Sequence, residues 1–266
     1  MAKTAGNMAK YRAQAKPYNE RIERMLLDEK EVLASIEPED SNAGSKKLAL
    51  ADETLNVVSL YVVVNGVSQA LLKSRDEDAL NNARKTLHKS IIYVEEVVTG
   101  YVDATFSEYK DRLEAIESVA PAWRFALVKK MGLAIDLVAN SYSDNTKWRW
   151  TFVELRGRLA AVAKNLINMD QLGANTDPRS PHYEATVYHL RLVKNLLNQS
   201  SERYREKYEL SSKSVEDFNK SLQFLAALRR LNILTGARDE AETIKKKMEI
   251  WNSKLTADIK KRKSSG

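Results

Sequence analysis

Apolar residues recur at intervals of three and four along most of this chain, the spacing that places them on one face of an α-helix. Glycine and proline are sparse, and most of them lie where this periodicity stops, as is typical of helix ends. The pattern predicts helices over residues 17–36, 45–73, 74–116, 121–140, 147–166, 181–211, 214–235 and 237–263. The predicted fold is therefore all-α: a multi-helix bundle of about eight helices, mostly long and antiparallel, joined by short loops.

The segment Val57–Gly66 gives the best signal for a β-strand. It is dense in β-branched residues and closes with an Asn-Gly pair, which favours the turn of a β-hairpin. However, Leu71 continues a helical spacing from Val64 and Val67, and the sequence offers no second strand as a partner. We therefore expect a helix in this segment.

The third predicted helix is unusually long. It opens with Ser74-Arg75-Asp76-Glu77, in which the serine hydroxyl and the glutamate carboxylate can satisfy free backbone donors reciprocally. Its apolar spacing continues from Leu80 to Ile116, so a straight helix would be about 60 Å long. Such a helix either forms the spine of the protein or bends at Gly100.

The longest break in the periodicity, residues 168–181, is rich in glycine, proline and short polar residues. It predicts an N-terminal helical bundle region (1–169), a loop (170–180) and a C-terminal three-helix region (181–266), packed together as one unit. A solenoid of stacked repeats is the alternative architecture. The predicted helices differ widely in length, however, and no fixed repeat recurs.

Charge is distributed unevenly along the chain. Residues 1–144 carry 19 Lys and Arg against 22 Asp and Glu, a net charge of −3, while residues 145–266 carry 24 against 14, a net charge of +10. The N-terminal region is thus acidic to neutral and the C-terminal region is basic. This asymmetry is the feature of the sequence that points toward a partner.

The composition places the chain among soluble globular proteins, with 43% hydrophobic and 30% charged residues. The absence of cysteine excludes disulfides and thiolate metal sites. The first ten residues carry positive charge but no apolar run, so we expect no secretory signal and a cytoplasmic location. The uncharged stretch Thr54–Leu72 is about long enough to span a bilayer. Polar residues surround its circumference, which favours a buried core helix, and we expect no transmembrane segment.

The sequence nominates no catalytic, cofactor-binding or metal-binding residue. No phosphate loop, nucleophile elbow or dinucleotide fingerprint occurs. The three histidines, His88, His182 and His189, lack carboxylates at the spacing of a metal site. Clusters of acidic residues open the third and eighth predicted helices, where they complement the helix dipole. We therefore expect no cofactor and no enzyme.

The fifth predicted helix is apolar on two sides. Trp148, Phe152 and Leu155 belong to one apolar face, and Trp150 and Gly157 belong to nearly the opposite face. A helix of this kind normally packs against neighbours on both sides. The tryptophans are thus expected to be core anchors, in preference to surfaces on which nucleic-acid bases stack.

Two sets of residues are candidates for contact with a partner. The basic residues of the last predicted helix, candidates for binding a polyanion or another partner, are Lys245, Lys246, Lys247, Lys254, Lys260, Lys261, Arg262 and Lys263. The same charges are also compatible with a solvated tail. Tyr204 and Tyr208 lie in a stretch of mixed charge and are candidates for a protein interface, because tyrosine is amphipathic and costs little to order.

These observations favour a non-enzymatic helical interaction or scaffold protein that binds another protein, or a second copy of itself, through helix faces. The alternative is binding of nucleic acid or another polyanion through the basic C-terminal helix. An enzyme comes third, and only a convergent set of buried titratable groups would support it.

Overall fold

The computed structural model describes the backbone of residues 2–37, 40–142 and 146–264, and the side chains in these ranges except those of residues 2–4, 146 and 263. Its α-helices are α1 (Ala2–Ala34), α2 (Ala43–Leu72), α3 (Glu77–Val97), α4 (Lys110–Glu114), α5 (Pro121–Ser141), α6 (Arg149–Asn165), α7 (Leu172–Asn175), α8 (Tyr183–Lys207), α9 (Val215–Leu234) and α10 (Arg238–Ser264). The described residues contain no strand. The predicted all-α fold is confirmed, because eight of these helices are long and only α4 and α7 are short.

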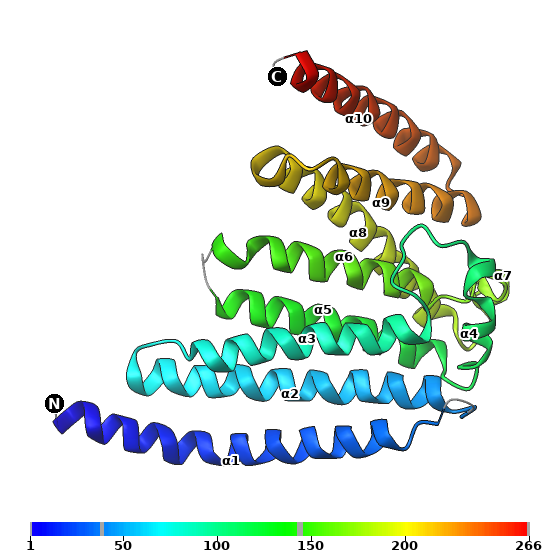
Figure 1. Ribbon diagram of the computed structural model, residues 1–266. Helices are drawn as coiled ribbons and strands as arrows, with labels where there is room; N and C mark the ends of the chain where they lie inside the picture. The colour runs from blue at the N-terminus through cyan, green and yellow to red at the C-terminus, as the bar shows by residue number, and fades with distance from the viewer. Residues whose placement is uncertain (1, 38–39, 143–145, 265–266) are drawn as a thin grey trace.

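The long helices are stacked in chain order from one end of the molecule to the other (Figure 1). α1 packs on α2, α2 on α3 and α5, and α6 on α3, α5 and α8, while α9 lies between α8 and α10. Neighbours in sequence are therefore neighbours in space, and α1 and α10 lie at opposite ends (Figure 1). The long helices range from 17 residues in α6 to 33 in α1, so the stack has no repeat of fixed length.

The hydrophobic core runs through most of this stack. One cluster of buried residues extends from Leu48 in α2 to Leu255 in α10. A smaller cluster joins α1 to α2 and includes Ile22, Val57 and Val64. Residues on both sides of the 170–180 loop contribute to the larger cluster. The division of the chain into an N-terminal and a C-terminal region stays a prediction.

The segment Val57–Gly66 is helical, as predicted, and forms the middle of α2. Length and composition alone would allow α2 to cross a membrane, and a third of its most apolar stretch is buried inside the stack. Its buried polar side chains have partners: the Thr54 hydroxyl donates to the Leu50 carbonyl, and the Asn65 side-chain oxygen accepts from the backbone N–H of Asp76.

The prediction of one helix from Ser74 to Ile116 is wrong at both ends. The N-cap is Asp76, whose carboxylate accepts from the backbone N–H of Ala79 at 2.9 Å. The helix ends at Val97, and the chain continues to α4 through a loop that contains one short 3-10 helix, η1 (Phe106–Glu108). The apolar spacing persists because side chains of this loop, such as Val102, are buried in the core without being helical.

The first helix also differs from the prediction, because α1 begins at Ala2 and contains Pro17 in its interior. A proline normally stops a helix, since it lacks the N–H that donates to the preceding turn. Here residues on both sides of the proline, Ala15 and Ile22, are buried against α2. Packing on α2 is therefore continuous across the position where the sequence suggested a helix start.

Candidate functional site

The central cations of α10 are engaged with acids of the same chain. Lys247 donates to Glu202 of α8 at 2.5 Å, and its ammonium lies 4.9 Å from the centre of the Trp251 ring. Lys254 donates to Asp258 at 3.1 Å. The Lys247 contact joins α10 to α8, and the Lys254 contact lies within α10. These two lysines are therefore not free to bind an external anion.

The C-terminal part of α10 is attached to the turn between α8 and α9. Arg262 donates to the Lys213 carbonyl at 2.7 Å and to the Tyr208 hydroxyl at 3.0 Å. Its guanidinium also lies 5.4 Å from the centre of the Tyr208 ring. The cation nearest the C-terminus whose side chain is described is therefore a structural contact.

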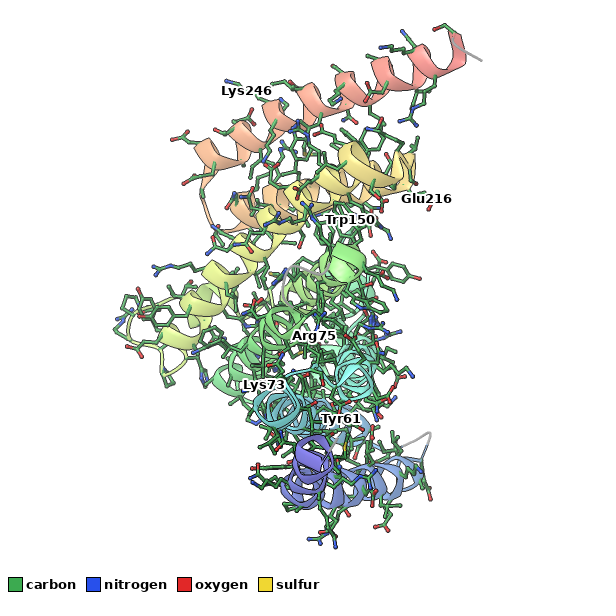
Figure 2. The ribbon with its side chains drawn as sticks, turned by 90° about the vertical axis from the view of Figure 1, so that its left-hand side faces the viewer. Tyr61, Lys73, Arg75, Trp150, Glu216 and Lys246 are labelled. Atoms are coloured by element: carbon green, nitrogen blue, oxygen red, sulfur yellow. The ribbon has the colours of Figure 1, made fainter. Side chains whose placement is uncertain are left out.

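The other predicted cations are dispersed along the helix. Lys245 pairs with Glu242 on α10 itself at 3.8 Å, and Lys261 is exposed. Lys246 and Lys260 are exposed and form no ion pair or hydrogen bond with any residue that the structure describes, and Figure 2 shows Lys246 projecting from the outside of α10. The side chain of Lys263 lies outside the described residues. The structure does not bring the seven candidates whose side chains it describes together into one patch.

The expectation that Tyr204 and Tyr208 lie on an exposed protein interface is wrong, because both side chains are in the core. Tyr204 stacks on Phe224 with ring centres 5.5 Å apart. Tyr208 packs edge-on against Phe218 at 4.8 Å, and its hydroxyl donates to Asp258 at 2.9 Å. Both tyrosines continue the helical spacing of buried residues that includes Leu197, and this spacing indicates burial. The charged residues beside them in the sequence made the spacing difficult to recognise.

The predicted central helix, α6, is buried on both faces. Phe152 and Leu155 are buried on one face, and Val153 and Gly157 on the other. Trp148 and Trp150 are half-buried and pack against the main core cluster, in agreement with the prediction that they are anchors. α6 thereby forms a floor on which α5 and α8 lie.

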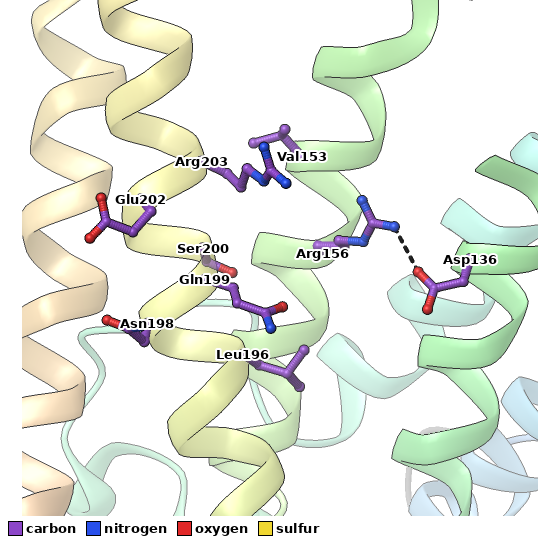
Figure 3. A pocket seen from close by; sticks show the side chains of 9 residues that line it. All are labelled: Asp136, Val153, Arg156, Leu196, Asn198, Gln199, Ser200, Glu202 and Arg203. Carbon is purple, nitrogen blue, oxygen red and sulfur yellow. Dashed lines mark hydrogen bonds and ion pairs between the residues drawn. The ribbon is translucent and has the colours of Figure 1, made fainter. Parts of the chain in front are cut away.

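A groove that the sequence did not predict runs between α5 and α8 over this floor. One part is a cavity of about 530 Å³ (Figure 3), and the adjoining part has a volume of about 290 Å³. The two parts share four lining residues, which are Asp136, Arg156, Leu196 and Gln199. Figure 3 shows Arg156 reaching from α6 to Asp136 on α5, with the side chain of Gln199 on the α8 side. We call this continuous depression the α5–α8 groove.

The smaller part of the α5–α8 groove is mainly apolar. Leu133 on α5 lines it and is 66% exposed, and Leu137, one turn further along α5, is 42% exposed. Leu192 and Leu196 on α8 are half-buried on the opposite side. Large apolar side chains that remain this exposed and lie close together mark an interaction surface more often than chance.

The rim of the groove carries a neutral ion pair and a cationic end. Arg156 donates to Asp136 at 2.6 Å. Near the α5 N-terminus, Phe125 stacks on Tyr188 with ring centres 6.4 Å apart. Lys129 lies 5.5 Å from the Phe125 ring, and Arg191 lies 5.7 Å from the Tyr188 ring. Among the described residues, neither of these two cations has an acidic partner.

The histidines do not form a site. His88 lies on α3 with its Nδ1 atom 3.1 Å from the Arg158 guanidinium, and His182 lies at the start of α8. His189 is inside α8, where burial lowers its pKa to about 4 and keeps the imidazole neutral near pH 7. Within the described ranges there is no group of three metal-ligating side chains.

The fold and the groove define a class: an all-α stack of helices with an apolar groove. The chain belongs to the TP0443 family, whose family model matches residues 7–259. No curated protein and no solved structure matches the chain significantly. The family description names no activity, ligand or partner.

Proposed function

We propose that this chain is a non-enzymatic interaction protein that binds an amphipathic helix of another protein in the α5–α8 groove. The observation that carries the proposal is Leu133, which is 66% exposed and lines the groove together with Leu192 and Leu196. An amphipathic helix presents apolar anchors three or four residues apart, the same spacing as Leu192 and Leu196 on the α8 wall. Burying one exposed leucine side chain fully contributes about 1.5–3 kcal/mol.

The charges at the rim specify the partner further. Lys129 and Arg191 lie beside the aromatic pair at one end and have no described acidic partner. An acidic residue on the bound helix would pair with them, because complementary charge at the rim increases the association rate and fixes the orientation. The partner segment is therefore an amphipathic helix with acidic residues near the end that lies on Lys129.

Binding of a polyanion through α10 has less support. Lys247, Lys254 and Arg262 are held by acids, a carbonyl and a hydroxyl of the same chain. Phosphate binding requires cations that can converge on the ligand and release counterions. Lys246 and Lys260 form no such contact among the described residues, but they lie more than ten residues apart on the helix and do not converge.

Photo-crosslinking at matched positions tests the proposal. A photoreactive amino acid is placed at position 133 and, in a second variant, at position 250 on α10. Leu133 and Ile250 are equally exposed, at 66% and 68%. We expect position 133 to give a discrete cross-linked protein in the source cells that position 250 does not give. Mass spectrometry of the cross-linked peptide would identify a segment with helical apolar spacing.

Purified components then test the contact directly. We expect Leu133→Asp to weaken binding of the identified segment at least tenfold, which is about 1.4 kcal/mol, and Ile250→Asp to leave it unchanged. The proposal is overturned if positions 133 and 250 capture the same proteins, or if the two aspartate variants bind equally. Cross-linking between two copies of this chain alone would also overturn it, because the occupant would then be a second copy.

A further inference from the structure

A second cavity, of about 490 Å³, lies on the other side of the α6–α8 contact from the groove. It is open to solvent on one side and is lined by α6, α8, α9 and the loop that follows α3. Its lining residues are Gly100, Tyr101, Val102, Asp103, Glu154, Gly157, Arg158, Ala161, Tyr204, Lys220, Gln223 and Phe224. Neither the proposed docking groove nor the family assignment accounts for it.

The loop wall of this cavity is held by buried polar side chains. Asn165, which is fully buried, donates to the carbonyls of Thr99 and Tyr101 at 2.8 and 3.1 Å. Lys164 is also buried and donates to the Ala104 carbonyl at 3.0 Å, and burial lowers its pKa to about 8. A lysine is seldom buried without a carboxylate partner, because removing its charge from water is costly. Its contact therefore fixes the position of the loop.

Backbone strain is present in the same wall. Thr99 has a φ angle of 150°, which a residue with a β-branched side chain rarely adopts. Strain of this kind persists only where surrounding contacts impose it, and it is concentrated at functional sites. Here the contact is a hydrogen bond that the Asn165 side-chain amide donates to the Thr99 carbonyl.

The floor is aromatic, and one polar group on it makes no hydrogen bond with the described residues. Tyr204 and Phe224 are stacked, and Gly157 of α6 lies directly beneath them. A Cβ atom at position 157 would lie 2.7 Å from Cε2 of Tyr204, so this close approach requires glycine. The Tyr204 side chain is 3% exposed, and its hydroxyl has no hydrogen-bond partner among the residues that the structure describes. The hydroxyl is therefore available to a ligand in the cavity.

Opposite charges lie on two sides of this floor. Glu154 lies one turn before Gly157 on α6, and Lys220 lies one turn before Phe224 on α9. Within the described part of the chain, neither forms an ion pair or a hydrogen bond, although the Lys220 ammonium lies 5.6 Å from the centre of the Tyr204 ring.

The other charged groups of the cavity are already occupied. Arg158 makes a bidentate contact with Glu95, at 2.8 and 2.6 Å. Asp103 accepts a hydrogen bond from the Gln223 amide at 3.2 Å. Glu154 and Lys220 are thus the charges that remain for a ligand.

We propose that this cavity binds a zwitterionic amino acid, with the ammonium group on Glu154, the carboxylate on Lys220 and the side chain against the Tyr204 and Phe224 rings. A simple anion would be repelled by Glu154, and a simple cation would be repelled by Lys220. A ligand that carries both a positive and a negative charge can pair with Glu154 and with Lys220 at the same time. The Tyr204 hydroxyl supplies an additional hydrogen bond to the carboxylate.

The test measures binding of each of the twenty common L-amino acids to the purified full chain by NMR titration. We expect at least one of them to bind with a Kd of about 1 mM or below. The N-acetyl and amide derivatives of that amino acid should bind at least tenfold more weakly, because each lacks one of the two charges. The absence of any amino acid with a Kd of about 1 mM or below, or equal binding of the blocked derivatives, would overturn the proposal.

Variants assign the two charges to the two walls. We expect Glu154→Gln to weaken binding of the free amino acid but not of its N-acetyl form, and Lys220→Gln to weaken the free amino acid but not its amide. Glu249→Gln and Lys246→Gln, two exposed positions on α10, are the matched controls. Because all four positions are exposed, the variants should keep the far-UV circular dichroism of the parent. An equal loss of affinity in the controls would contradict the proposed site.

Discussion

α1 and α10 lie at the two ends of the stack, and each packs on one long neighbour, but they are attached by different kinds of contact. α1 contributes Ala15 and Ile22 to a small apolar cluster, and its half-buried Val32 packs against the main core cluster. Its attachment is completed by Glu29, a buried carboxylate that accepts from the Lys89 ammonium and the Tyr93 hydroxyl of α3. A second polar contact joins Tyr11 to Asp76 at 2.5 Å.

α10 is attached mainly by apolar packing. Ile244, Trp251 and Leu255 belong to the main core cluster, and Trp251 lies edge-on to Phe218 with ring centres 6.2 Å apart. The ion pairs of Lys247 and Lys254 surround this apolar contact and are partly exposed. The apolar residues of α10 therefore contribute most to its attachment to the stack, and its ion pairs contribute less to that attachment.

The comparison shows that net charge in the sequence is a poor guide to where charge matters for the fold. The N-terminal region has a small net charge, yet it contains the buried carboxylate Glu29 with two partners on α3. The C-terminal region has a large net charge, most of which lies at the surface. A buried charge that loses its partner costs several kcal/mol, whereas an exposed ion pair contributes about 0–1 kcal/mol.

The largest effect is expected for Trp251→Ala, which removes the main apolar contact of α10. Truncation of a buried tryptophan costs about 3–5 kcal/mol, measured here as the loss in the free energy of unfolding in urea. Ile250→Ala, at an exposed neighbouring position, should change that free energy by no more than about 0.5 kcal/mol. If the two variants lose the same stability, packing is not what holds α10.

An intermediate effect is expected for Glu29→Ala at the other end. The substitution leaves the Tyr93 hydroxyl unpaired in a buried position, which costs about 1–3 kcal/mol. Hydrogen exchange should accelerate in α1 and leave α10 unchanged. Glu23→Ala, an exposed position on α1, is the control, and equal exchange rates in the two variants would contradict a specific role for Glu29.

The smallest effect is expected for Asp258→Asn, and it should depend on pH. Hydrogen bonds from Lys254 and Tyr208 hold the pKa of Asp258 below its ordinary value. Because the folded pKa is the lower one, the carboxylate stabilises the fold above the ordinary pKa of about 4, and this contribution disappears as the pH falls through the folded pKa. The difference in stability between Asp258→Asn and the parent should be below about 1 kcal/mol at pH 7.

The pH series gives the decisive comparison for Asp258. Urea unfolding at pH 7, 4 and 3 should show the difference between Asp258→Asn and the parent shrinking as the pH falls. Glu249→Gln, whose side chain makes no hydrogen bond or ion pair with the described residues, should show no such trend. A difference that stays constant with pH would mean that the charge of Asp258 does not contribute to the attachment of α10.

Local signals in the sequence predicted most helix ends. Pro121 is the first residue of α5, Ser214 caps α9 by accepting from the backbone N–H of Glu216, and Gly236 follows α9 with a φ angle of +76°. Each of these signals acts within a few residues, so it can be interpreted without knowledge of the fold. The predicted N-cap at Ser74 failed because Asp76, two residues later, competes for the same role.

The groove and the second cavity could not be predicted in this way. Both depend on which helices become neighbours, and no pattern within a single helix contains that information. Leu133 has the same apolar character as the buried residues of α5, and only the position of α8 leaves it exposed. The residue type of Tyr204 makes it a candidate for a protein interface in the sequence. Its position on the floor of the cavity depends on Gly157 and Phe224, which are distant in sequence.

The order of the stack has a consequence for how the chain folds during synthesis. Because successive helices pack on one another, most contacts are local in sequence, and proteins of low contact order fold rapidly. Each helix leaving the ribosome meets a partner that has already been made. The loop wall of the second cavity is the exception, since Asp103 contacts Gln223 of α9 across 120 residues. The cavity is therefore among the last parts of the molecule to be completed, after the helices around the groove have assembled.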